Sequence, residues 1–177
     1  MKSKLTRTQG VKLAACVAAL LLMSACSHAI PQAVAQEPSN DTACALDGMM
    51  LKDFPGPKAQ ILYVEGKPDF FCDLMELFST TLMPEQKRQI AAMFVQDMGK
   101  TDWDHPSAHW IAAKTAVYVV GSKKLGSMGP TFGSFANAQD AEIFAKKEGG
   151  KIFRFDQITS NMVNMSGGVA HDMKMSH

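Results

Sequence analysis

The side chains best suited to chemistry in this sequence gather in residues 44–50 (CALDGMM). Cys44 offers a thiol, Asp47 a carboxylate and Met49 a thioether, and Gly48 lets the backbone fold around a common centre. Thiolate and thioether sulfurs are soft ligands that select Cu(I) over hard cations. The pattern therefore indicates a site that holds one cuprous ion and releases it again. The alternative is structural: Cys44 is a buried small residue or half of a disulfide, and the methionines begin a core strand.

The N-terminus has the features of a bacterial lipoprotein signal. Basic residues precede an apolar run over residues 11–23, which is shorter than the roughly 20 apolar residues that span a bilayer. The run ends in residues 22–26 (LMSAC), which resemble a lipobox. We therefore expect residues 1–25 to be a signal peptide and Cys26 to be lipidated as the first mature residue. The alternative is an ordinary secretory signal that is cleaved after residues 33–35 (AVA).

This signal predicts the compartment. A lipid anchor would hold the protein on a bacterial membrane, facing the periplasm, and Ser27 after the lipidated cysteine favours the outer membrane. Cys44 and Cys72 are then the two remaining thiols, and in an oxidising periplasm free thiols pair unless something keeps them apart or occupied. The net charge of +1 gives no electrostatic case for nucleic acid as a partner.

Local patterns predict a strand, a strand, a helix and a strand in the first half of the mature chain. The expected strands are residues 49–51, 60–64 and 90–95, and the expected helix covers residues 71–82 with Asp69 as its cap. Two prolines and a glycine in residues 53–57 predict a turn between the first two strands.

The second half repeats this plan. Its expected strands are residues 109–112, 116–120 and 151–155, its helix is 138–148, and a glycine-rich loop over 121–133 carries Met128. The fold class is therefore predicted to be α+β, with two homologous small ββαβ units packed together. Their bounds are residues 44–99 and 100–158, preceded by a flexible tether (26–43) and followed by a disordered tail (159–177).

The tail carries further soft and imidazole ligands in a polar setting. These are His171, Met173, Met175 and His177. They would form a secondary, weaker metal site that raises the local copper concentration, or they have no function at all.

Several segments together resemble the NosL family, the accessory lipoproteins of nitrous oxide reductase. The segments, in chain order, are Cys44-x-x-Asp47-Gly48-Met49, Gly56-Pro57-Lys58-Ala59-Gln60-Ile61, Val95-x-Asp97-Met98-Gly99, Trp103-Asp104-x-Pro106, Trp110-Ile111-x-Ala113, Val119-x-Gly121-Ser122, Met128-Gly129, Gly149-Gly150 and Phe155-Asp156. The resemblance covers residues 44–158.

The resemblance implies a lipoprotein of two ββαβ units that binds one Cu(I) and is not an enzyme. The copper would serve assembly of the nitrous oxide reductase copper centres in denitrification, with the reductase apoprotein and the ABC-type Nos D, F and Y system as partners. Carried over by position, Cys44 and Met49 are the leading ligands, Asp47 is a ligand or an orienting group, and Met128 closes the site. Many family members have a second cysteine where this chain has Asp47, so this chain lacks the local CxxC pair.

Other functions remain open at this stage. Cys44 and Cys72 would form a reversible disulfide in a thiol-redox protein, or a structural disulfide that silences the copper site. A haem carrier would use His105 or His109 with a methionine, although the sequence has no CxxCH attachment motif. A hydrolase is disfavoured because neither a nucleophile elbow nor an HExxH motif is present.

Overall fold

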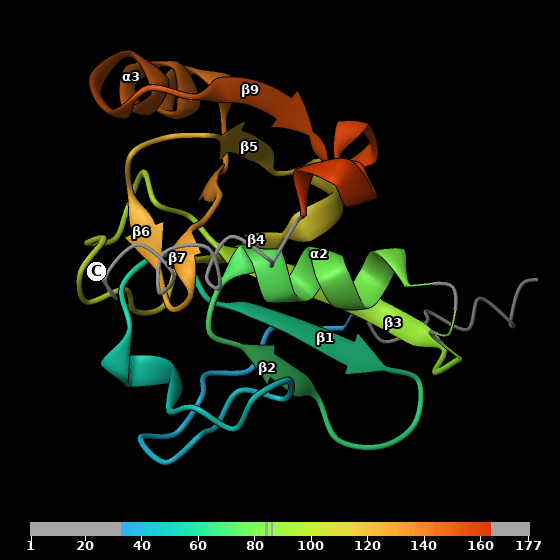
Figure 1. The fold of residues 1–177 in the computed structure, drawn as a ribbon. Coiled ribbons are helices and arrows are strands. Elements are labelled where there is room, and N and C mark those ends of the chain that lie inside the picture. Colours follow the sequence, from blue (N-terminus) through green and yellow to red (C-terminus); the bar gives the residue numbers. More distant parts are fainter. Residues whose placement is uncertain (1–32, 84, 86, 164–177) are drawn as a thin grey trace, which may run out of the picture. The chain divides into compact units, whose positions relative to one another are not determined.

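The computed structural model describes residues 33–83, 85 and 87–163 of the 177-residue chain (Figure 1). The predicted signal peptide, the lipidation site Cys26 and the four metal-binding candidates of the tail lie outside the described residues. Within the described ranges, helices are too short or too polar to cross a membrane.

The first sheet has four antiparallel strands with the order β2-β1-β3-β4. They are β1 (Ala59–Tyr63), β2 (Asp69–Phe71), β3 (Ile90–Gln96) and β4 (Trp110–Ala112). Helix α2 (Leu74–Leu82) lies along this sheet in Figure 1 and joins β2 to β3. Every residue of β1 is buried, as expected for the central strand of a sheet with a covered face.

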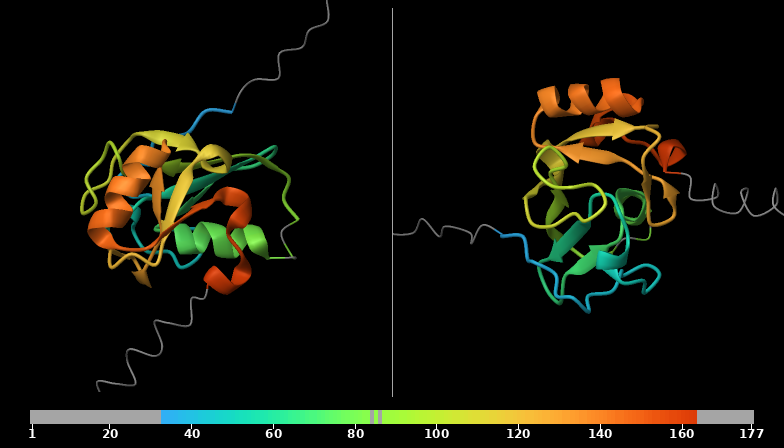
Figure 2. Two further views of the ribbon diagram at one scale, coloured as in Figure 1. Left: turned by 90° about the horizontal axis from the view of Figure 1, so that it is seen from above. Right: turned by 90° about the vertical axis from the view of Figure 1, so that its left-hand side faces the viewer.

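The second sheet has three antiparallel strands with the order β8-β5-β9. They are β5 (Val117–Val120), β8 (Gly133–Phe135) and β9 (Lys151–Arg154), and helix α3 (Ala138–Glu148) joins β8 to β9. A small hairpin of β6 (Leu125–Gly126) and β7 (Gly129–Pro130) precedes β8. In Figure 2, α3 covers this second sheet on the side away from α2. The fold is therefore α+β, as predicted.

One hydrophobic core joins the two sheets through α2. Phe78 of α2 makes an edge-to-face contact with Tyr118 of β5, with ring centroids 5.1 Å apart. Its ring also lies 5.6 Å from Phe132 and 5.3 Å from Phe155. Because α2 is packed in this shared core, its first turn is held at a fixed position relative to β2.

Two predictions at the start of the first half are wrong. Residues 49–51 do not form a strand: Met50 makes a single bridge to Ala43, and Leu51–Asp53 is a short 3-10 helix. The Leu51 side chain is buried beside Cys44 and Cys72, and the chain turns here instead of continuing as a strand. Asp69 is not the helix cap either, because residues 69–71 pair with β1 as β2 and Asp73 caps α2.

The second half also differs from the prediction. The segment expected to open it, residues 109–112, contains β4, which pairs with β3 of the first sheet. The predicted loop over 121–133 contains the β6–β7 hairpin and leads directly into β8. A segment forms a strand only where it can pair with the edge of another strand. A local sequence pattern does not show which strand edge is available for this pairing.

The predicted tether and tail are partly attached to the fold. Gln36 exchanges two hydrogen bonds with the Gln60 side chain, at 2.8 and 2.9 Å, and Glu37 accepts from the Trp110 indole at 2.7 Å. At the other end, Ser160–Met162 forms a 3-10 turn and Val163 is buried in the main core. The described parts of both segments are therefore ordered by contacts that their polar composition does not reveal.

Candidate metal centre

Three potential ligand side chains meet where β2 leads into α2. The thiol sulfurs of Cys44 and Cys72 and a carboxylate oxygen of Glu76 all lie within 4.8 Å of one another. All three residues are buried, with at most 3% of any of them exposed. Apolar neighbours surround the two thiols; they are Leu51, Met49, Phe54 and Phe70. We call Cys44, Cys72 and Glu76 the cysteine cluster.

Backbone hydrogen bonds hold Cys44 against β2. The Cys44 amide donates to the Met49 carbonyl at 2.7 Å, and the next amide, of Ala45, donates to the Phe70 carbonyl at 2.8 Å. The intervening turn closes at Gly48, whose φ of +77° lies in the left-handed region that glycine tolerates best. Residues 44–50 thus form a loop that is closed on itself and attached to the strand before Cys72.

The position of Glu76 follows from helix geometry. Asp73 caps α2 by accepting from the amides of Met75 at 2.9 Å and Glu76 at 3.3 Å. Glu76 is four residues after Cys72, and its Oε2 accepts from the Cys72 amide at 2.8 Å. The same oxygen accepts from the Cys44 thiol, also at 2.8 Å. One carboxyl oxygen therefore joins two chain segments that are far apart in sequence.

Burial changes the protonation of this carboxyl. Loss of water raises the pKa of Glu76 from 4.5 to about 9, and the hydrogen bond with Cys44 raises it further in the same direction. Glu76 is therefore predominantly neutral at pH 7. Its second oxygen, Oε1, is buried and has no hydrogen-bond partner among the described residues.

The two thiols differ in acidity. Hydrogen bonding from Cys72, and then from Glu76, lowers the pKa of Cys44 from 9.0 to about 6 against the opposing effect of burial. The pKa of Cys72 is raised because its thiol proton is held by Cys44 and because it is buried near other negative groups. Cys44 is thus the thiol that ionises first, and thiolates are the metal-binding form of cysteine.

A buried lysine lies next to the cluster. The Lys58 ammonium donates to the carbonyls of Phe54 at 2.7 Å, Cys72 at 2.9 Å and Pro55 at 3.1 Å. Burial lowers the pKa of Lys58 to about 8, while the nearby Cys72 and acidic groups oppose this shift. Lys58 therefore places a positive charge close to the backbone of Cys72.

The predicted ligands take different places. Met49 is half-buried, packs against the cluster and accepts from the Cys72 thiol through its carbonyl at 3.7 Å. Asp47 is exposed, and its Oδ1 accepts from the Met49 amide at 2.9 Å, so it shapes the loop. Met128 lies in the β6–β7 turn and is 44% exposed. Its neighbour Ser127 donates to Asp73 Oδ2 at 2.9 Å, which places this hairpin beside the N-terminus of α2.

Sequence reasoning considered Cys72 only as a disulfide partner and did not single out Glu76. The spacing Cys72-x-x-x-Glu76 was the available signal, because residues four apart at the start of a helix share one face. Both cysteines are free thiols in this structure, so neither the redox nor the structural disulfide is formed.

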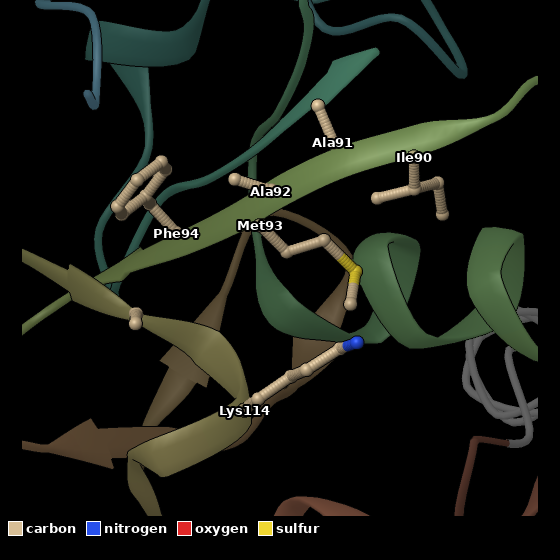
Figure 3. Close-up of a pocket in the computed structure, with 7 residues that line it drawn as sticks. Ile90, Ala91, Ala92, Met93, Phe94 and Lys114 are labelled. Atoms are coloured by element: carbon tan, nitrogen blue, oxygen red, sulfur yellow. The ribbon is translucent and has the colours of Figure 1, made fainter. Parts of the chain in front are cut away.

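Other candidate groups lie apart from the cluster. His105 and His109, the proposed haem ligands, are exposed. A pocket of about 290 Å³ lies along β3, where Figure 3 shows Met93 and Lys114 among its lining residues. It borders β3 and β4, whereas the cluster adjoins β2 at the opposite edge of the sheet. Its lining is mostly apolar and contains no thiol or carboxylate.

Comparisons with known proteins agree on one family. The NosL family model matches residues 35–163. A copper-binding lipoprotein NosL of Stutzerimonas stutzeri is 36% identical over 135 residues, covering 76% of this chain and 70% of the relative. Another copper-binding lipoprotein NosL, of Achromobacter cycloclastes, is 39% identical over 153 residues, covering 82% and 79%.

A solved structure matches the fold as well. The crystal structure of the copper chaperone NosL from Shewanella denitrificans is 41% identical, with a TM-score of 0.70, and the match covers 74% of this chain and 98% of that one. Because the family model matches most of the chain and both relatives exceed 30% identity over more than two thirds of their length, this chain belongs to the NosL family.

Proposed function

We propose that this protein is a metallochaperone that binds one Cu(I) at Cys44. The observation that carries the proposal is the acidic Cys44 thiol, buried among Cys72, Glu76 and the half-buried Met49. Soft sulfur in an apolar, enclosed setting suits Cu(I) better than Ca²⁺ or Mg²⁺, which prefer oxygen. The names of the relatives, copper-binding lipoprotein and copper chaperone, support the same cargo.

The proposed roles of the other predicted residues follow from their positions. Met49 adds a thioether, which carries no charge and loses no proton on binding. Asp47 orients the loop through the Met49 amide instead of ligating the metal directly. Met128 is the residue proposed to close the site, from the β6–β7 turn that lies beside the N-terminus of α2.

Release would proceed by ligand exchange. Two- or three-coordinate Cu(I) has an open side on which the ligands of an acceptor can attack, so no free ion and no catalytic group are needed. We propose that the acceptors are the nitrous oxide reductase apoprotein and its Nos D, F and Y assembly system. A lipid at Cys26 would hold the chain on the periplasmic side, at the outer membrane, and the tail would supply a weaker capture site.

We also propose that the two halves of the fold are homologous. In the first sheet, β1 lies between β2 and β3, and α2 joins these two outer strands. In the second sheet, β5 lies between β8 and β9, and α3 joins them in the same way. This match supports two homologous ββαβ units.

A thiol-redox function is the second candidate. Its specific support is that the Cys44 and Cys72 sulfurs lie within 4.8 Å and that one of the thiols is acidic. A redox protein would cycle between dithiol and disulfide and would not need to retain Cu(I) in competition with a chelator.

A transfer experiment separates the two functions. Copper-loaded protein would be mixed with copper-free nitrous oxide reductase in the presence of a strong chromogenic Cu(I) chelator, without oxygen. Transfer to the reductase with little copper appearing on the chelator is the expected result, and Cys44→Ser should not support it. If the reductase gains copper only when the chelator is left out, the copper passes through solution and delivery by ligand exchange is wrong.

A further inference from the structure

The two thiols of the cluster point to a specific copper geometry. We propose that Cys72 is a second copper ligand, so that this chain holds Cu(I) between the Cys44 and Cys72 thiolates. This inference rests on the proposed function and adds a ligand that the motif around Cys44 does not contain. The second thiolate comes from the β2–α2 junction, 28 residues further along the chain.

The distance between the sulfurs suits such a site. With bonds of roughly 2.3 Å, the zinc–thiolate length, two sulfurs on one metal ion lie at most roughly 4.6 Å apart. Cys44 Sγ and Cys72 Sγ lie within 4.8 Å of one another, so both are close enough to bind the same ion. Cys72 is fully buried and Cys44 is 3% exposed, so the pair is enclosed.

Glu76 fixes the relative position of the two cysteines. Its Oε2 accepts from the Cys44 thiol and from the Cys72 amide, each at 2.8 Å. Its Oε1 is buried and unpartnered among the described residues, which costs free energy unless a group in the cluster interacts with it. Glu76 is therefore a positioning residue: it holds one cysteine by its side chain and the other by its backbone.

Lys58 balances the charge of the site. Any proton that the two thiols still carry passes to solvent when Cu(I) binds, and no electron is transferred, so the complex of two thiolates with one Cu(I) has a charge of −1. An isolated buried charge is costly. The Lys58 ammonium, 2.9 Å from the Cys72 carbonyl and itself buried, supplies the compensating positive charge.

The experiment is X-ray absorption at the copper edge together with Cu(I) competition titration, on the full-length protein in detergent. The variants are Cys72→Ser and Cys72→Ala, and Met93→Leu is the control because it removes a sulfur that lies along β3, away from the cluster. We expect two short copper–thiolate bonds in the wild type, in addition to the thioether contact of Met49. We expect both Cys72 variants to lose one of these bonds and to bind Cu(I) more weakly by at least roughly 100-fold, the upper end of outer-shell effects.

Thermal unfolding of the metal-free variants shows which of them retain the fold, and Cys72→Ala serves if Cys72→Ser is unstable. Met93→Leu should keep both copper–thiolate bonds and the wild-type affinity. Unchanged sulfur coordination and affinity in a folded Cys72 variant would overturn the two-thiolate site and leave the proposed function standing. Absence of tight Cu(I) binding in the reduced wild type would overturn the proposed function itself.

Discussion

Glu76 Oε2 accepts from the Cys44 thiol and the Cys72 amide, and this shared oxygen determines much of the chemistry of the cluster. When Cys44 ionises, a neutral Glu76 becomes the donor to the thiolate. This contact adds to both pKa shifts: it reinforces the burial that raises the pKa of Glu76, and it reinforces the hydrogen bond from Cys72 that lowers the pKa of Cys44. A carboxylate at this place would instead repel the thiolate, so the burial of Glu76 favours a reactive Cys44.

Glu76→Gln should reveal this neutral state through the pH dependence of stability. The folded pKa of about 9 exceeds the unfolded value of 4.5, so the stability that Glu76 contributes is complete below pH 4.5 and is lost as the pH rises toward 9. Glutamine does not titrate, and its side-chain amide can still donate a hydrogen bond to the Cys44 thiolate as neutral Glu76 does. We expect the variant to gain stability relative to wild type between pH 5 and pH 9, as measured by chemical unfolding. A constant difference across this range would show that Glu76 is ionised in the folded protein.

Lys58→Met should weaken copper binding. The variant removes the positive charge beside Cys72, and we expect a loss of roughly 10- to 100-fold in Cu(I) affinity, typical of an outer-shell partner. Lys52→Met is the control, because Lys52 is exposed. Lys58→Arg should recover part of the affinity if charge is the cause. Equal affinities for Lys58→Met and Lys52→Met, with both proteins folded, would show that Lys58 has no electrostatic role.

At the scale of elements, the cluster depends on a short loop, a three-residue strand and the first turn of a helix. Long elements with a clear period were predictable: α3 was found at its observed bounds, and β1, β3 and β5 within one residue at each end. The strand β2 was missed because Phe71 also fits the helical pattern, and Asp73 was therefore overlooked as the cap. The junction that places Cys72 and Glu76 together was consequently not predicted, although their four-residue spacing was a signal for it.

Gly48→Ala should test the loop without filling any space. The added Cβ meets nothing within 4 Å, but the φ of +77° disfavours alanine by roughly 1 kcal/mol. Gly121→Ala is a matched control, with a φ of +78° and equally open surroundings in the second half. We expect similar losses of stability on chemical unfolding, and weaker Cu(I) binding only for Gly48→Ala. The same affinity in both variants would show that the shape of the loop does not matter for the site.

At the scale of the whole molecule, the shared core fixes α2 between the two sheets. Phe78 packs against Tyr118, Phe132 and Phe155, all from the second half, so α2 is positioned by contacts distant in sequence. Sequence patterns predicted the α+β class correctly, because the periodicity that distinguishes helices from strands is a local property. They assigned β4 to the wrong sheet, because strand partners and core contacts are decided by the complete fold.

Removal of residues 169–177 should leave the tight copper site intact. The cluster is formed by residues 44–76 and is enclosed by side chains of the same region, so the tail is not required for it. We expect the truncated protein to bind one tight equivalent of Cu(I) with unchanged affinity in a competition titration, and to lose at most a weaker equivalent. Loss of the tight equivalent would place the main site in the tail.

The most direct measurement is an anaerobic Cu(I) titration of the reduced full-length protein against a chromogenic competing chelator. Wild type and Cys44→Ser would be compared under the same conditions, with thermal unfolding as the check on folding. We expect one tight equivalent in the wild type and none in Cys44→Ser, because Cys44 is the acidic thiol of the cluster. Full retention of the tight equivalent by a folded Cys44→Ser protein would contradict a copper site centred on Cys44.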